Sequence, residues 1–263
     1  MTDNNNYQIK SVLRALDILE LLASKGGSGR ISDIAREIGC SKNTAFRLLQ
    51  TLQEREFVRQ ADDSSYELTF KLLNLGETVM RTTEVHDIAR PYIQNLVKLC
   101  GETATLAILD DDEIVYVDRV HGNMPHNTSY SIGSRAKAYR TSLGKAILAF
   151  SSETVVDHCL NQELQANTEY TITDPNRIRS ELREVAQRGY ATDNQENVLG
   201  IRCIGAPIFD RKGEVVAAVS VSGLAVRLTD QCLKDFSLHL LDTTRAISSR
   251  LGYSDSLRRH SSA

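Results

Sequence analysis

Three polar side chains of one predicted helix have the types and the spacing needed to contact base edges in DNA. Asn43, Arg47 and Gln50 recur at helical spacing and therefore share one face. Asparagine and glutamine can bond adenine in the major groove, and arginine can bond guanine through two N–H groups. Lys42 and Thr44, at the start of the helix, could hold phosphates. The candidate DNA-binding residues are Ser41, Lys42, Asn43, Thr44, Arg47 and Gln50.

An ordinary solvated helix also presents a polar face, so the neighbouring elements decide the interpretation. Apolar residues recur at helical spacing over 9–22, and a second short helix is expected after Ser32, which could cap it. Ser41 then caps the third helix. Two short helices joined by a glycine-containing turn are typical of a helix-turn-helix. The segments 57–60 and 65–70 flank a turn and predict a hairpin, or wing, so a winged domain that reads DNA is favoured.

The Gly-Lys pair at 144–145 raises the question of a phosphate-binding loop. A Walker motif needs an earlier glycine and a hydroxyl residue after the lysine, where this chain has Tyr139 and Ala146. An ATPase site is therefore excluded. The segment instead predicts a helix start, whose N–H groups could receive a carboxylate. Ordinary capping by Thr141 or Ser142 is equally consistent with these residues.

The second half of the chain predicts strands in two hairpins with helices around them, which describes an α+β domain. The strands are expected at 103–110 with 113–120, and at 204–210 with 214–223. The helices are expected at 142–150, 153–160, 175–189 and 229–251. Strand alternation puts Ser220 and Ser222 on one face, either a ligand-binding face or a polar outer face of the sheet.

Length and composition define the class of protein. A chain of 263 residues, 41% hydrophobic and 25% charged, can form two ordinary globular domains. The formal net charge of -3 means that DNA contacts must come from a local basic face. No apolar stretch approaches the roughly 20 residues of a membrane span and the start lacks a signal peptide, so we expect a cytoplasmic protein without a membrane partner.

A break near residues 82–84 marks the expected boundary between the two domains. We predict a winged helix-turn-helix domain at 1–70, a linker helix at 71–83, a second domain at 84–255 and a flexible tail at 256–263.

The titratable residues give no sign of metal or redox chemistry. The five cysteines are scattered without a C-x-x-C pair, and the six histidines show no ligand spacing. No Ser/His/Asp or nucleotide-binding constellation emerges either. We therefore predict no metal, no cofactor and no catalytic residue.

Four segments together resemble the IclR family of transcription regulators from about Ser11 to Tyr253. They are SVLRALDILELL, the ISDIAREIGCSKNTAFRLLQTLQEREFV block with its hairpin, TSLGKAILA, and GYATDNQENVLGIRCIGAPIFDRKGEVVAAVSVSG. The resemblance implies winged domains that dimerise and a C-terminal GAF-like α/β domain that binds a metabolite, in a homodimer or homotetramer.

The resemblance also assigns an effector site. It implies that Asp193, Cys203, Ser220 and Ser222 contact the effector, with Leu143 and Ile201 as apolar walls. The residues 142–144 at the helix start would hold a carboxylate. Since Asp193 would repel that carboxylate, it should accept a hydrogen bond from a hydroxyl or carbonyl at the far end. The candidate effector-binding residues are Ser142, Leu143, Gly144, Asp193, Ile201, Cys203, Ser220 and Ser222.

Two departures from the family pattern limit this assignment. Asp62 and Asp63 in the wing turn would repel phosphates, so no contact is expected from the wing tip. Arg140 adds a cation near the expected pocket, which leaves open a more negatively charged effector.

The sequence therefore predicts a sequence-specific DNA-binding regulator, more specifically a repressor of a catabolic operon. Its partners would be double-stranded operator DNA and a small carboxylate metabolite, an organic or sugar acid. Two alternatives stay open at this point: an enzyme built on the α+β domain, and an architectural DNA-binding protein without an effector.

Overall fold

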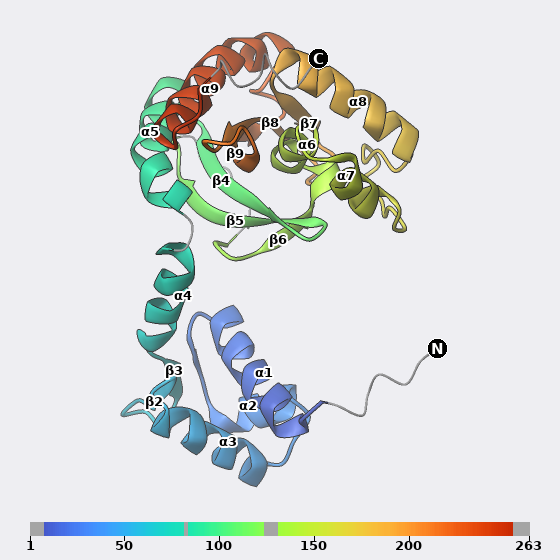
Figure 1. The fold of residues 1–263 in the computed structure, drawn as a ribbon. Helices are drawn as coiled ribbons and strands as arrows, with labels where there is room; N and C mark the ends of the chain where they lie inside the picture. Colours follow the sequence, from blue (N-terminus) through green and yellow to red (C-terminus); the bar gives the residue numbers. More distant parts are fainter. Residues whose placement is uncertain (1–7, 82–83, 124–130, 255–263) are drawn as a thin grey trace. The chain divides into compact units, whose positions relative to one another are not determined.

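The computed structural model describes residues 8–81, 84–123 and 131–254, with residues 77–81 and 84 by their backbone alone. Contacts divide the chain into two compact units at residues 82 and 83 (Figure 1). Each unit is considered by itself. The predicted tail at 256–263 and the start of the chain, 1–7, lie outside the described residues.

The first unit is a helical domain with a small antiparallel sheet. Its helices are α1 (Lys10–Ser24), α2 (Ile31–Glu37), α3 (Lys42–Glu54) and α4 (Lys71–Arg81). Its strands are β1 (Ser28–Gly29), β2 (Val58–Gln60) and β3 (Tyr66–Leu68), in the order β1-β3-β2. The core joins α1, α2, α3 and the wing through Ile18, Leu22, Ile34, Leu49, Leu52, Val58 and Tyr66.

Most of the predicted winged architecture is confirmed, with two differences. Ser41 caps α3 as expected, because its Oγ accepts the Thr44 N–H at 3.1 Å. Capping of α2 by Ser32 is wrong: the helix already begins at Ile31, and Arg30 is the N-cap residue without a side-chain bond. The glycine-rich segment after α1 contributes β1, a strand that the sequence analysis did not predict.

The second unit is a six-stranded antiparallel sheet covered by helices. Its strands, in chain order, are β4 (Thr103–Asp110), β5 (Glu113–Val120), β6 (Arg135–Lys137), β7 (Ala191–Asn194), β8 (Ile201–Phe209) and β9 (Val215–Leu224). The helices are α5 (Glu84–Cys100), η1 (Ala138–Arg140), α6 (Ser142–Leu148), α7 (Glu153–Leu160), α8 (Pro175–Arg188) and α9 (Asp230–Arg250). The strand order is β6-β5-β4-β9-β8-β7.

The sheet is curled and has helices on both faces (Figure 1). The neighbours α5 and α9 pack against β4, β8 and β9, whereas α6, α7 and α8 share a core with the other face. The predicted α+β class and both hairpins are confirmed, and pairing of β4 with β9 joins the hairpins into one sheet. The short edge strands β6 and β7 were not predicted. Among the described residues, no helix has the length and hydropathy of a membrane span.

Two glycines allow α6 to lie unusually close to its neighbours. A Cβ atom at Gly144 would lie 2.2 Å from the carbonyl oxygen of Ala138, and one at Gly205 on β8 would lie 2.6 Å from the carbonyl oxygen of Ser142. Both contacts involve backbone atoms, which cannot rotate away. The start of α6 is therefore fixed between η1 and the sheet.

Gly144→Ala should destabilise the second unit by about 1 to 3 kcal/mol, because a methyl group there forces the backbone of η1 away. Urea unfolding monitored by circular dichroism measures this loss. Gly76→Ala on α4 is the matched control, since a Cβ there meets nothing within 4 Å and alanine favours a helix by up to about 1 kcal/mol. Equal unfolding midpoints for the two variants would contradict the packing role of Gly144.

Candidate functional site

The polar face predicted on α3 is turned to solvent. Asn43, Arg47 and Gln50 are exposed, while Ala45 and Leu49 on the opposite side have no exposed surface. Burial of the apolar face in the core leaves the three polar side chains free to contact another molecule. This arrangement is what the reading helix of a helix-turn-helix requires.

The residues at the start of α3 have two different roles, capping of the helix and presentation of positive charge. Ser41 Oγ accepts the Thr44 N–H and lies 2.9 Å from Thr44 Oγ1, so both hydroxyls stabilise the helix end. Lys42 is exposed beside them. In the wing, Arg59 pairs with Glu67 across the two strands, at 2.9 Å. The positive charge offered to DNA is therefore concentrated on α3 rather than on the wing.

The second unit contains a narrow cavity between the start of α6 and one face of the sheet. Its volume is about 20 Å³, room for about one water molecule, so a ligand of several heavy atoms needs part of the wall to move. The lining residues are Thr105, Tyr116, Arg119, Thr141, Ser142, Leu143, Asp193, Asn197, Val198, Ile201, Cys203, Ser220 and Ser222. Every predicted effector residue except Gly144 is among them.

Gly144 has a different place from the one predicted. Its N–H donates to Thr141 Oγ1 at 2.9 Å and is not available to an anion. It does not line the cavity, and its missing side chain serves the close packing against Ala138. The expected ligand contact at Gly144 is therefore replaced by capping and packing, the alternative that the sequence left open.

The strand register explains how residues far apart in the sequence form one polar surface. Side chains that face each other across paired strands lie on the same face of a sheet. The polar lining residues on the strands form two neighbouring rows, Asp193–Cys203–Ser222 and Ser220–Thr105–Arg119. The rows reach from β7 across β8, β9 and β4 to β5.

Asp193 is the acid at one end of this surface. It is 3% exposed, and its Oδ1 accepts the Glu196 N–H at 2.7 Å. Burial raises the pKa of Asp193 to about 7, although the positive charge of Lys145 opposes the shift. Near neutral pH the carboxyl group is therefore protonated in part and can donate as well as accept a hydrogen bond.

Cys203 occupies the neighbouring position on β8. Burial and the adjacent Asp193 carboxyl raise the pKa of the Cys203 thiol well above its ordinary value. The side chain is therefore a neutral thiol that lines the cavity and is not a nucleophile.

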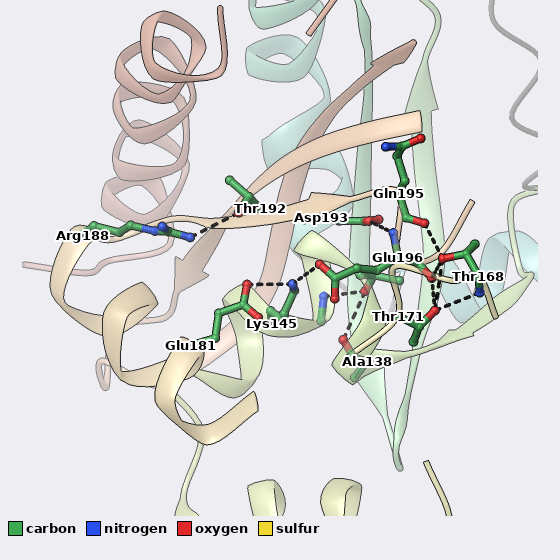
Figure 2. Close-up of polar contacts among 12 residues, drawn as sticks. Ala138, Lys145, Thr168, Thr171, Glu181, Arg188, Thr192, Asp193, Gln195 and Glu196 are labelled. Carbon is green, nitrogen blue, oxygen red and sulfur yellow. Dashed lines mark hydrogen bonds and ion pairs between the residues drawn. The ribbon is translucent and has the colours of Figure 1, made fainter. Parts of the chain in front are cut away.

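A buried charge cluster lies behind Asp193. Lys145 has no exposed surface, and its Nζ lies 2.8 Å from Glu181 Oε1 and 2.7 Å from Glu196 Oε1 (Figure 2). Burial alone lowers the pKa of Lys145, but the two glutamates outweigh it and raise the pKa. Glu196 is itself buried, so its salt bridge with Lys145 lies inside the unit.

The segment that follows Asp193 forms part of the cavity wall and is held from one side by hydroxyl groups. Thr168 Oγ1 donates to the Gln195 carbonyl at 2.7 Å, and Thr171 Oγ1 donates to the Glu196 carbonyl at 2.6 Å (Figure 2). The Asn167 amide donates to the Asn197 carbonyl at 2.6 Å. These bonds position the polar side of the cavity.

Several lining residues escaped the sequence analysis, above all Arg119, Thr105, Tyr116 and Asn197. Thr105 had a usable signal, because strand pairing in the correct register sets it beside Ser220. Asn197 lies in an irregular segment, where no periodicity indicates the direction of a side chain. Arg140, the cation expected near the pocket, is not among the lining residues.

Asp193→Asn should change how stability depends on pH. Folding raises the pKa of the Asp193 carboxyl group from its unfolded value, near 3.8, to about 7. The contribution of this group to the free energy of unfolding is therefore complete below pH 3.8 and is lost as the pH rises through about 7. The stability of the variant relative to the natural protein should therefore grow between pH 5 and 7 and level off above pH 8.

Urea unfolding at pH 5, 6, 7 and 8 measures this difference. Asp235→Asn, which changes an exposed aspartate on α9, controls for the loss of one carboxylate. A difference between Asp193→Asn and the natural protein that stays constant with pH would contradict the shifted titration.

Both units of the chain match known protein families. The IclR helix-turn-helix domain matches residues 11–62, and the C-terminal domain of the bacterial transcriptional regulator IclR matches residues 77–249. The HTH-type transcriptional regulator KdgR of Escherichia coli K12 is 34% identical over 256 residues, which cover 96% of this chain and 97% of that protein. The transcriptional repressor IclR of the same organism is 31% identical, with 93% and 91% covered.

Solved structures show the same relationship. The crystal structure of Thermotoga maritima IclR has a TM-score of 0.85 and 35% sequence identity, and the match covers 94% of this chain and all of that one (100%). These relatives are transcriptional regulators and not enzymes, and the matches include the helix-turn-helix as well as the unit with the cavity. The chain is therefore a DNA-binding transcriptional regulator that belongs to the IclR family.

Proposed function

We propose that the protein represses a catabolic operon and is controlled by a small hydroxy or oxo acid bound in the cavity of the second unit. The observation that carries this proposal is the convergence of Ser142, Asp193, Ser220 and Ser222 on one enclosed polar space. Polar groups from three different elements would be costly to gather there without a ligand to contact. A relative named as a transcriptional repressor supports the sign of regulation.

The proposal is tested by capturing genomic DNA fragments with the full chain and locating the bound site by footprinting. Four acids are then added in turn to the complex of protein and operator: glycolate, lactate, pyruvate and gluconate. These four compounds are called the acid panel. An effector should change operator affinity, because it can do so only by favouring one of two arrangements of the protein. An operator complex that responds to none of these acids would argue for the architectural alternative.

An exposed apolar stripe along the first helix supports the proposal of a homodimer. Ile9, Val12, Leu13 and Leu16 follow helical spacing and are 39 to 66% exposed. A second copy of the chain would cover this stripe and present two α3 helices related by a two-fold axis. The operator would then be palindromic, with half-sites about one helical turn or a multiple apart. A tetramer would be a pair of such dimers.

Arg47→Ala should weaken specific operator binding by about 1 to 3 kcal/mol without affecting folding, since an exposed arginine on α3 is placed to read a base. Mobility-shift titration at constant salt measures the affinity. Arg55→Ala, at the exposed C-cap residue that follows the same helix, serves as the control. Unchanged specific affinity in Arg47→Ala would remove this residue from the reading face.

Replacing Ser220 and Ser222 together by alanine should weaken effector binding by about one order of magnitude or more. Each hydroxyl contributes about 0.5 to 1.5 kcal/mol to a hydrogen bond with the ligand. Calorimetric titration uses the acid of the panel that raises the melting temperature of the full chain most. Operator affinity without acid should not change, and equal acid affinity in variant and natural protein would place the effector elsewhere.

A further inference from the structure

A β-bulge in β5 turns an arginine toward the cavity. Ala107 of β4 pairs with Tyr116, and the next residue, Leu106, pairs with Asp118, so β5 carries one extra residue between them. A bulge of this kind changes which face the following side chains occupy. Strict alternation would put Tyr116 and Arg119 on opposite faces, but both line the cavity.

The same bulge separates Arg119 from the acid beside it in the sequence. The carboxylate of Asp118 lies 2.5 Å from the Arg90 guanidinium and 3.6 Å from His86 Nε2, both on α5. Helix α5 packs against β4, β5 and β9, whereas α6, which borders the cavity, shares a core with the other face of the sheet (Figure 1). The negative charge of Asp118 is therefore paired behind the sheet, while Arg119 contributes positive charge to the cavity wall.

Arg119 and Asp193 are the charged side chains among the lining residues that the structure describes. They come from β5 and β7, with β4, β9 and β8 between them, so they lie at opposite ends of the polar surface. A ligand that spans this surface meets a cation at one end and a carboxyl group at the other.

We propose that Arg119 binds the anionic group of the effector and thereby sets both its orientation and its class, an acid whose neutral oxygen-bearing end reaches Asp193. This inference rests on the effector site proposed above. The planar guanidinium of arginine fits a carboxylate through two parallel N–H bonds. The alternative anchor at the start of α6 is weaker, because that helix has seven residues and its Gly144 N–H is occupied by Thr141.

The proposal predicts discrimination by charge. The full chain is titrated with the acid panel and with the corresponding primary amides, glycolamide, lactamide, pyruvamide and gluconamide, which keep the shape but lose the charge. The natural protein should bind its preferred acid at least roughly 10-fold more tightly than the matching amide. Arg119→Gln should lose roughly 10- to 100-fold in acid affinity and keep its amide affinity, which removes the discrimination.

Arg140→Gln is the matched control, because it removes a neighbouring cation that does not line the cavity, and it should keep the full preference for the acid. Melting temperature and operator binding without acid verify the fold of each variant. If Arg119→Gln does not fold, Arg119→Lys carries the test: it keeps the charge without the two-pronged geometry, and its acid-to-amide preference should fall several-fold.

Two results overturn the assignment in distinguishable ways. Tight acid binding that is equal in the natural protein and Arg119→Gln would leave the effector class intact and remove Arg119 from the anion site. Binding of none of the eight compounds by the natural protein would overturn the class of effector, and this proposal with it.

Discussion

One lysine without exposed surface determines how the cavity is built. Lys145 comes from α6, Glu181 from α8 and Glu196 from the segment after β7, and its ammonium group bonds both carboxylates. Removing a charge from water costs several kcal/mol unless it is paired with good geometry. These three elements therefore have one favourable arrangement, in which the ammonium group lies between the two acids. The position of Asp193, three residues before Glu196, depends on that arrangement.

The cavity wall combines rigid and less rigid parts. The sheet rows and the start of α6 are fixed by strand pairing and by backbone contacts at Gly144 and Gly205. The segment 195–198 depends instead on side-chain bonds from Thr168, Thr171 and Lys145. Because the space is too narrow for an acid of several atoms, binding of the proposed effector would require this segment of the wall to move.

Sequence patterns predicted the fold correctly where the periodicity of apolar residues agrees with their packing in the structure. The spacing around Ala45 and Leu49 identified the exposed face of α3, and two β-branched hairpins identified the main sheet. The family resemblance identified most of the cavity lining. Sequence patterns could not predict the position of a side chain where a single irregularity in the backbone changes the face on which it lies. The extra residue in β5 reverses the face of Arg119, and alternation alone cannot reveal it. The Gly144-Lys145 pair resembles part of a phosphate-binding loop, but Gly144 serves close packing and Lys145 forms a buried ion pair.

The environment of Cys203 also bears on how the protein responds to oxidants. Oxidation by peroxide and exchange with disulfides both begin from a thiolate, and burial beside Asp193 keeps this sulfur protonated. In the proposed effector site, a reactive cysteine would link effector binding to the redox state of the cell. The protonated Cys203 would instead serve there as a small polarizable contact surface.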